Sequence, residues 1–161
     1  MIKRTTSLSR PIIEALYTEA LVLADDVRAE FAGSAEERAA TVGEGPSRPQ
    51  DAMARLALST EGLKTTTRMM HVLAWLLNQR AYFSGELSEK QVRLHGALPE
   101  DRAADHDQLG LLEPDTRALI EETERLHMRI ARLDTAWRQN FAMTSPARAF
   151  QDRIGREFGD S

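Results

Sequence analysis

The feature that most constrains this chain is a stretch of residues 50–83 that contains no proline and a single glycine, Gly62. Proline breaks a helix interior and glycine weakens it, so this composition favours one uninterrupted helix. At a rise of 1.5 Å per residue such a helix would be about 50 Å long. The sequence therefore predicts a long helix over about residues 50–83, and Gly85 is expected to end it.

Two rows of residues at alternating spacings of three and four follow this predicted helix. The first seam consists of Met53, Leu56, Thr60, Leu63, Thr67, Met70, Ala74, Leu77 and Ala81. The second seam lies on a different face and consists of Leu58, Gly62, Thr65, Met69, Val72, Leu76, Gln79 and Phe83. With Trp75 between the seams the helix is apolar on more than one side, so one seam is expected to face the sister helices and the other to need another chain. We assign the second seam to a dimer or partner interface, formed by Leu58, Thr65, Met69, Val72, Leu76 and Phe83.

Two further helices flank this one in the sequence. Ser9 and Pro11 are typical of a helix start, and the apolar row that follows indicates a helix over about residues 10–32 that ends at Gly33. Pro114 opens a third helix over about residues 114–141, with an apolar row of Leu119, Thr123, Leu126, Ile130, Leu133, Trp137 and Phe141. Together these rows predict an all-α fold, a three-helix bundle that forms one domain over residues 1–161.

Polar connections join the predicted helices, and a short segment follows them. Residues 33–49 are expected to form a surface connection because they contain Gly43, Gly45, Pro46 and Pro49. In the second connection, residues 84–113, Ser88 with Gln91 can cap one short helical turn. Residues 146–158 predict a short C-terminal amphipathic segment that either docks on the bundle or contacts a partner through Phe150, Ile154 and Phe158.

Composition excludes several functions. The chain has no cysteine, which rules out disulfides, thiolate nucleophiles and cysteine-ligated zinc. Its net charge of −4 provides no global positive field that would attract nucleic acid. The longest apolar run, Val72–Leu77, is far shorter than the roughly 20 residues of a membrane helix, and no signal peptide is apparent, so we expect a cytoplasmic protein.

No pattern in the sequence predicts a catalytic residue, a cofactor or a bound metal. Glu124 and His127 form one Glu-x-x-His motif, but di-iron bundles need two such motifs and two further glutamates, so a metal-binding enzyme remains an alternative. A row of Arg125, Arg129 and Arg132 on the third helix leaves a DNA-binding regulator as a second alternative, although acidic neighbours dilute it. The hydroxyl-rich run Thr65–Thr67 is expected to bond back to helix carbonyls.

The long helix also carries a recognisable sequence, Ser59-Thr60-Glu61-Gly62-Leu63-Lys64-Thr65-Thr66-Thr67-Arg68-Met69-Met70 followed by His71-Val72-Leu73-Ala74-Trp75-Leu76-Leu77-Asn78-Gln79-Arg80-Ala81. This run resembles the signature helix of the RcdA-like family, the regulators of CtrA degradation. The first and third helices fit more loosely, and the chain departs from the family pattern at Gly62 and His71, where serine and glutamine are expected.

The resemblance implies a non-catalytic three-helix bundle that forms a homodimer. The best-known member of the family is an adaptor that engages a ClpXP-type protease primed by a response regulator and brings it cargo for regulated proteolysis in the cell cycle. By this likeness we expect protein partners, namely a second copy, protease components and cargo, with no nucleic acid and no membrane.

Overall fold

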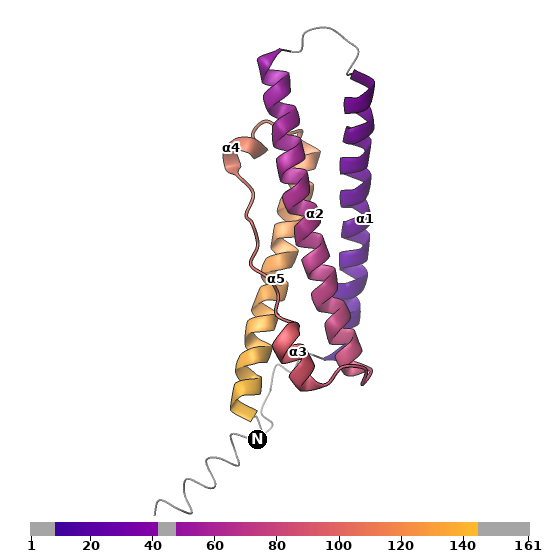
Figure 1. The fold of residues 1–161 in the computed structure, drawn as a ribbon, viewed down its shortest axis with the longest axis vertical. Coiled ribbons are helices and arrows are strands. Elements are labelled where there is room, and N and C mark those ends of the chain that lie inside the picture. The colour runs from indigo at the N-terminus through magenta and orange to yellow at the C-terminus, as the bar shows by residue number, and fades with distance from the viewer. Residues whose placement is uncertain (1–8, 42–47, 145–161) are drawn as a thin grey trace, which may run out of the picture.

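The computed structural model describes residues 9–41 and 48–144 and confirms an all-α fold (Figure 1). Its helices, in chain order, are α1 (Arg10–Thr41), α2 (Pro49–Phe83), α3 (Glu89–His95), α4 (His106–Leu109) and α5 (Pro114–Thr144). Within these described ranges there is no β-strand. The three long helices are the predicted ones, whereas the predicted segment 146–158, with Phe150, Ile154 and Phe158, lies outside the described residues.

The long helices form a bundle in which α2 packs against both α1 and α5. α1 and α2 run in opposite directions, and after α2 the chain turns at α3 and returns along the bundle as an extended segment that leads to α4 (Figure 1). As a result, α5 starts at the same end of the bundle as α2 and runs in the same direction. We call residues 97–105, the extended part of this return, the strap. It lies alongside α2 and α5, on the side away from α1 (Figure 1).

The ends of α2 follow from its sequence. Pro49 occupies the first turn, where its missing N–H leaves no hydrogen bond unmade. Gly85 has a φ of 82°, in the left-handed region that glycine adopts without strain. The N–H of Glu86 donates to the carbonyl of Ala81 at 2.9 Å and that of Gly85 to Tyr82 at 3.1 Å, the Schellman pattern that satisfies the last carbonyls. The prediction that Gly85 ends the helix is confirmed.

α1 is longer than predicted, because it does not end at Gly33 but continues to Thr41. Gly33 is not among the residues with a positive φ, so it continues the helix instead of capping it. Residues 34–41 are rich in alanine, glutamate and arginine. Such strong helix formers carry a helix past one glycine, which costs about 1 kcal/mol relative to alanine.

The connection between α2 and α5 contains the short capped turn that the sequence predicts. At the start of α3, the hydroxyl of Ser88 accepts from the N–H of Gln91 at 3.2 Å. The side-chain oxygen of Gln91 accepts in return from the N–H of Ser88 at 2.8 Å. This reciprocal capping box satisfies two N–H groups that the helix itself leaves unpaired.

The core lies on the face of α2 that carries the second seam. Met69, Val72 and Leu76 from this face are buried together with Trp75. Facing them are buried side chains of α1 and α5, namely Ile13, Leu16, Ala20, Leu23, Val27, Leu126 and Ile130. A smaller cluster of Ala57, Leu109, Leu112 and Ile120 joins α2 to α4 and α5. Burial of these side chains is the main apolar contribution to holding the three helices together.

A second contact fixes α1 against α2 at the surface. The guanidinium of Arg80 donates from Nε to Glu14 Oε1 at 2.9 Å and lies 4.3 Å from the ring centre of Tyr17. The hydrogen bond to Glu14 raises the pKa of Arg80, so the guanidinium keeps its charge.

Gly62 is a point of close contact between α1 and α2. A Cβ built at this position would lie 2.8 Å from Cδ1 and 3.1 Å from Cε1 of the Phe31 ring. Gly62 itself is buried, so the ring of Phe31 fills the space that any other residue would claim. The absence of a side chain at Gly62 therefore sets how closely the two helices pack.

We predict that Gly62→Val lowers the free energy of unfolding by about 1–3 kcal/mol, because the added methyl groups overlap the Phe31 ring and force it aside. The matched control is Gly33→Ala, where nothing lies within 4 Å of a built Cβ. This control is expected to stabilise α1 by about 0.5–1 kcal/mol through helix propensity alone. Urea unfolding followed by circular dichroism measures both, and a Gly62→Val chain as stable as wild type would contradict the packing argument.

Candidate functional site

The residues predicted to form a dimer or partner interface lie inside the bundle. Thr65, Val72 and Leu76 are 0% exposed and Met69 is 3% exposed. The remaining two, Leu58 and Phe83, are partly buried and pack against the two core clusters. The second seam therefore faces the sister helices of its own chain, and its assignment to another chain is corrected. Both seams share one spacing, but only the second contains Gly62, which lets α1 approach.

The first seam is the one that faces outward, and we call it the outer seam. Its large apolar side chains are exposed to 59% at Met53, 67% at Leu56, 68% at Leu63, 64% at Met70 and 48% at Leu77. Single exposed apolar residues are normal on a protein surface. A row of them at heptad spacing along one helix is instead typical of a face that packs against another helix.

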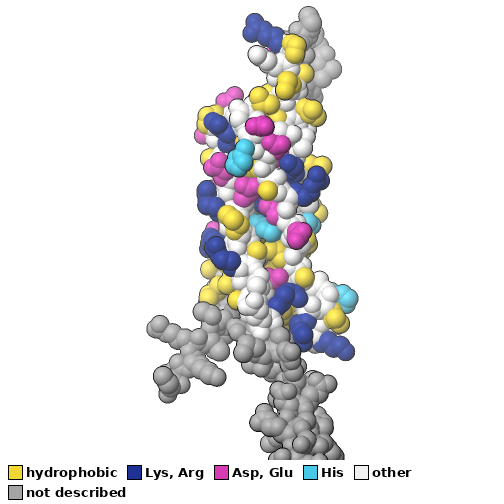
Figure 2. Space-filling view, turned by 90° about the vertical axis from the view of Figure 1, so that its left-hand side faces the viewer, with side chains coloured by type: hydrophobic (Ala, Val, Ile, Leu, Met, Phe, Trp, Pro, Cys, Tyr) yellow, Lys and Arg dark blue, Asp and Glu magenta, His cyan; other side chains and the backbone are white. Residues whose placement is uncertain are grey.

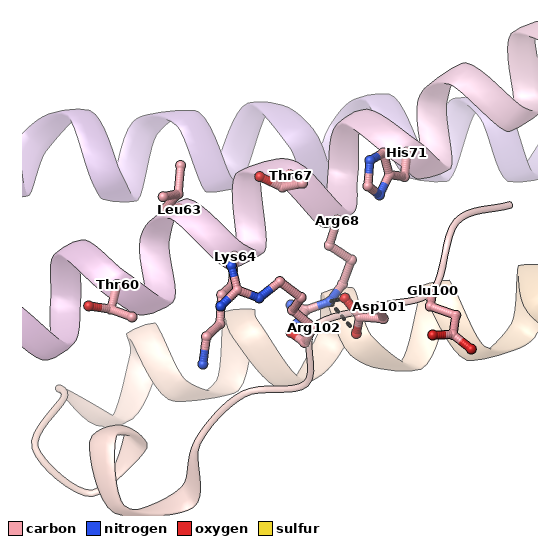
Figure 3. A pocket seen from close by; sticks show the side chains of 9 residues that line it. All are labelled: Thr60, Leu63, Lys64, Thr67, Arg68, His71, Glu100, Asp101 and Arg102. Carbon is pink, nitrogen blue, oxygen red and sulfur yellow. Dashed lines mark hydrogen bonds and ion pairs between the residues drawn. The ribbon is translucent and has the colours of Figure 1, made fainter.

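A depression borders the outer seam on each side. Between α1 and α2 lies a groove of about 350 Å³ with a largely apolar lining that includes Phe31, Met70 and Leu73. On the opposite side, between α2 and the strap, lies a cleft of about 250 Å³ (Figure 3). The cleft is lined by Thr60, Leu63, Lys64, Thr67, Arg68, His71, Glu100, Asp101 and Arg102. The outer seam is thus the centre of a wider surface that is apolar on one flank and charged on the other.

Charged side chains mark the face that carries the strap. Figure 2 views the bundle from this side and shows acidic, basic and histidine side chains intermixed across its middle, with hydrophobic side chains between them. This mixture differs from the outer seam, where the side chains at heptad positions are uncharged.

Arg68 is the centre of the polar contacts beneath this face, although its own side chain is 0% exposed. Its Nε donates to both carboxylate oxygens of Asp101 at 2.9 and 2.8 Å (Figure 3). Its terminal nitrogens donate to the hydroxyl of Thr123 at 2.9 Å and to the carbonyl of Arg102 at 3.1 Å. Glu124 Oε1 lies 3.5 Å from the guanidinium as a second anion. One buried arginine of α2 therefore binds the strap and α5 together.

A second buried polar contact lies further along the same helices. Trp75 is 2% exposed, and its indole N–H donates to Asp134 Oδ1 at 2.9 Å. The same oxygen accepts from Arg138 Nε at 3.0 Å, a pair at i,i+4 spacing on one face of α5. Asp134 Oδ2 accepts from the N–H of Leu98 at 3.4 Å, so this carboxylate also anchors the start of the strap.

The Glu-x-x-His pair of the third helix contacts the strap. Glu124 Oε1 accepts from the N–H of Ala104 at 2.7 Å, and His127 Nε2 lies 3.3 Å from the carbonyl oxygen of Pro99. Within the ranges that the structure describes, no group of three potential ligands is placed to hold a metal ion. The geometry thus explains both side chains by their contacts with the strap.

The other candidate groups also have structural partners. The hydroxyl of Thr65 donates to the carbonyl of Glu61 at 2.7 Å, as expected for a threonine inside a helix. Arg129, from the arginine row on which the DNA-binding alternative rests, pairs with Glu19 of α1 at 2.7 Å. Arg129 and Arg132 both line a surface groove between α1 and α5.

The apolar seams do not indicate the residues that hold the strap, although the sequence contains a signal for them. Glu61, Arg68 and Trp75 follow one another at intervals of one heptad on α2, and all three are buried. Glu61 accepts a hydrogen bond from the N–H of Asp105 in the strap, and Arg68 donates to the carboxylate of Asp101. Trp75 donates to Asp134 of α5, which in turn binds the start of the strap. Because buried polar groups need partners, a heptad-spaced polar row beside an apolar seam predicts a polar element packed against that helix.

Fold and site together define a class: an all-helical bundle whose longest helix exposes an apolar heptad seam and whose polar strap is fastened by buried charges. Among the described residues, no helix is long and apolar enough to cross a membrane. The chain belongs to the family described as "Protein of unknown function (DUF1465)", whose sequence profile matches residues 4–158. No curated protein and no solved structure matches the chain.

We predict that Arg68→Ala lowers the free energy of unfolding by about 3 kcal/mol, because it leaves Asp101, Glu124 and Thr123 without their shared donor. Arg102→Ala is the control, since the Arg102 side chain is exposed and only its main-chain carbonyl contacts Arg68. The control is expected to change stability by no more than about 0.5 kcal/mol. Chemical denaturation measures the difference, and equal effects of the two substitutions would contradict the central role of Arg68.

Proposed function

We propose that this protein is a non-catalytic interaction scaffold that forms a homodimer through the outer seam of α2. The observation that carries the proposal is the exposure of Leu56, Leu63 and Met70, between 64% and 68%, in one continuous row. Burying these side chains against a partner releases about 25 cal/mol for each Å² of apolar surface removed from water.

A second copy of α2 is the occupant that the outer seam fits best. From Leu56 onward, one position of each heptad carries a large residue, and these are Leu56, Leu63, Met70 and Leu77. The alternate position carries a smaller residue, and these are Thr60, Thr67, Ala74 and Ala81. In an antiparallel pair the two heptad positions face each other, so every layer sets a large residue against a small one. This keeps the separation of the two helices uniform, as close packing requires.

We predict that Met70→Glu disrupts the dimer, because it places a charge in the middle of a seam that is apolar at each end. Light scattering is then expected to give the mass of a single chain, 18.1 kDa, with unchanged helical circular dichroism. Met128→Glu on α5 is the matched control, because Met128 is 54% exposed but lies outside the outer seam. The proposal fails if wild type is already monomeric, or if both variants keep the mass of wild type.

We further propose that the chain is an RcdA-like adaptor of regulated proteolysis in the bacterial cell cycle, acting in the cytoplasm. The signature run of α2 from Ser59 to Ala81 supports this proposal. A family profile that matches residues 4–158 and carries no assigned activity is compatible with it. In this role the dimer would present its remaining surfaces to a ClpXP-type protease, to a response regulator or further adaptor, and to cargo.

We predict that the tagged protein recovers ClpXP components and a response regulator from its host lysate. It should also share a set of substrates with a proteolytically inactive ClpXP used as a second bait. The Met70→Glu chain serves as a comparison that separates contacts needing the dimer from those made by one chain. Recovery of neither protease components nor shared substrates would reject the adaptor role while leaving the dimer proposal to be judged by mass.

A further inference from the structure

The strap is recognised mainly through its backbone. Its N–H groups at Leu98, Ala104 and Asp105 donate to three carboxylates, those of Asp134, Glu124 and Glu61, at 3.4, 2.7 and 3.4 Å respectively. Its carbonyls accept from Arg68, at Arg102, and from Lys64, at Ala103, at 3.1 and 3.4 Å. These contacts do not depend on the side chains of the strap, so another extended segment could form them equally well.

One side chain of the strap adds a specific contact. Asp101 receives two hydrogen bonds from the buried Nε of Arg68, at 2.9 and 2.8 Å. Hydrogen bonds between two charged groups are stronger than neutral ones. Asp105, at the end of the strap, caps α4 by accepting from the N–H groups of Asp107 and Gln108. Among the described contacts of residues 97–105 with α2 and α5, Asp101 provides the side-chain hydrogen bond, so an acidic residue is the sequence requirement of the site.

The side chains beneath the strap are more buried than the strap itself. Glu61 is 0% exposed, Arg68 1%, His127 6% and Asp134 8%, whereas no residue of the strap falls in the buried class. The helix side therefore forms the floor of a groove, and the strap is a layer laid over it that shields these side chains from water. Glu61 Oε2 has no partner among the described residues, which leaves one acceptor in this groove for a further donor.

If the strap left, water could reach these charged groups and replace the hydrogen bonds that the strap provides, so none of them would remain buried without a partner. The buried residues of the main apolar cluster come from α1, α2 and α5. The strap adds two partly buried side chains, Leu98 against this cluster and Ala104 against the smaller one. The strap can therefore leave while the three long helices remain packed, since local opening costs less where few apolar contacts are lost.

We propose that the groove between α2 and α5 is a binding site for an extended peptide segment that carries an acidic residue opposite Arg68, and that the strap is its built-in occupant. A partner segment with an aspartate or glutamate at the position of Asp101 would pair with Arg68 and take over the backbone contacts. The strap then acts as an intramolecular competitor whose effective concentration, on the order of mM, sets the affinity a partner needs. The strap borders the outer seam at the cleft that Leu63 and Thr67 line, but the side chains that hold the strap are not part of the seam. The inference therefore holds whether or not the outer seam dimerises.

The test uses a fluorescent peptide with the sequence of residues 96–106, GALPEDRAADH, and the full chain carrying Asp101→Ala. Anisotropy is expected to show binding to this variant at least about tenfold tighter than to wild type, whose own strap competes. A peptide with asparagine in place of the aspartate that corresponds to Asp101 is expected to bind at least about tenfold more weakly. Adding Arg68→Gln to the variant should abolish this preference. Equal binding of the two peptides, or of wild type and variant, overturns the proposal.

Hydrogen exchange on the wild-type chain provides a second test that does not depend on the folding of any variant. The amides of Leu98, Ala104 and Asp105 are expected to exchange by local opening, faster than those of Val72 and Ile130 in the core. If the strap amides are protected as strongly as the core amides, the strap leaves only on global unfolding and cannot yield to a partner. Adding Met70→Glu should change neither result, which separates this site from the dimer.

Discussion

A guanidinium that is shut away from water must find a partner for each of its N–H groups, and Arg68 imposes this demand halfway along α2. Helix α5 supplies two of these partners, the hydroxyl of Thr123 and one carboxylate oxygen of Glu124, and the remaining N–H groups need others. Asp101 and the carbonyl of Arg102 complete the set, so the strap must pass directly over this point. Because the strap carries the chain back along the bundle, α5 begins beside the start of α2 and runs parallel to it (Figure 1).

The lengths and ends of the helices were largely predictable from sequence because they depend on local chemistry. Gly85 and the Ser88–Gln91 capping box act through their own backbone geometry, and each lies where the pattern places it. Gly33 shows the limit of such signals. A glycine ends a helix only when the chain beyond it gains by turning, and here the following residues favour the helix.

The orientation of α2 and the path of the strap could not be predicted from periodicity. Two apolar seams on one helix satisfy the same spacing, and the choice between them depends on what α1 brings to the contact, namely the ring of Phe31 against Gly62. The strap has no period of its own because its hydrogen bonds go to side chains on other elements. Its position is set by groups far apart in sequence, such as Glu61 and Asp134. The indication that the sequence does contain is the heptad spacing of Glu61, Arg68 and Trp75, each of which carries a polar group.

The two seams of α2 are under different structural constraints, and we call their residues the inner set (the second seam) and the outer set (the outer seam). The inner set must fit the other helices of its own chain, and a change there alters stability before it alters anything else. The outer set is largely exposed, so substitutions at Leu56, Leu63 or Met70 are expected to leave the bundle intact. Related chains can therefore evolve different binding partners while keeping the same fold. Substitutions on the outer side of the helix do not disturb the packing on its inner side.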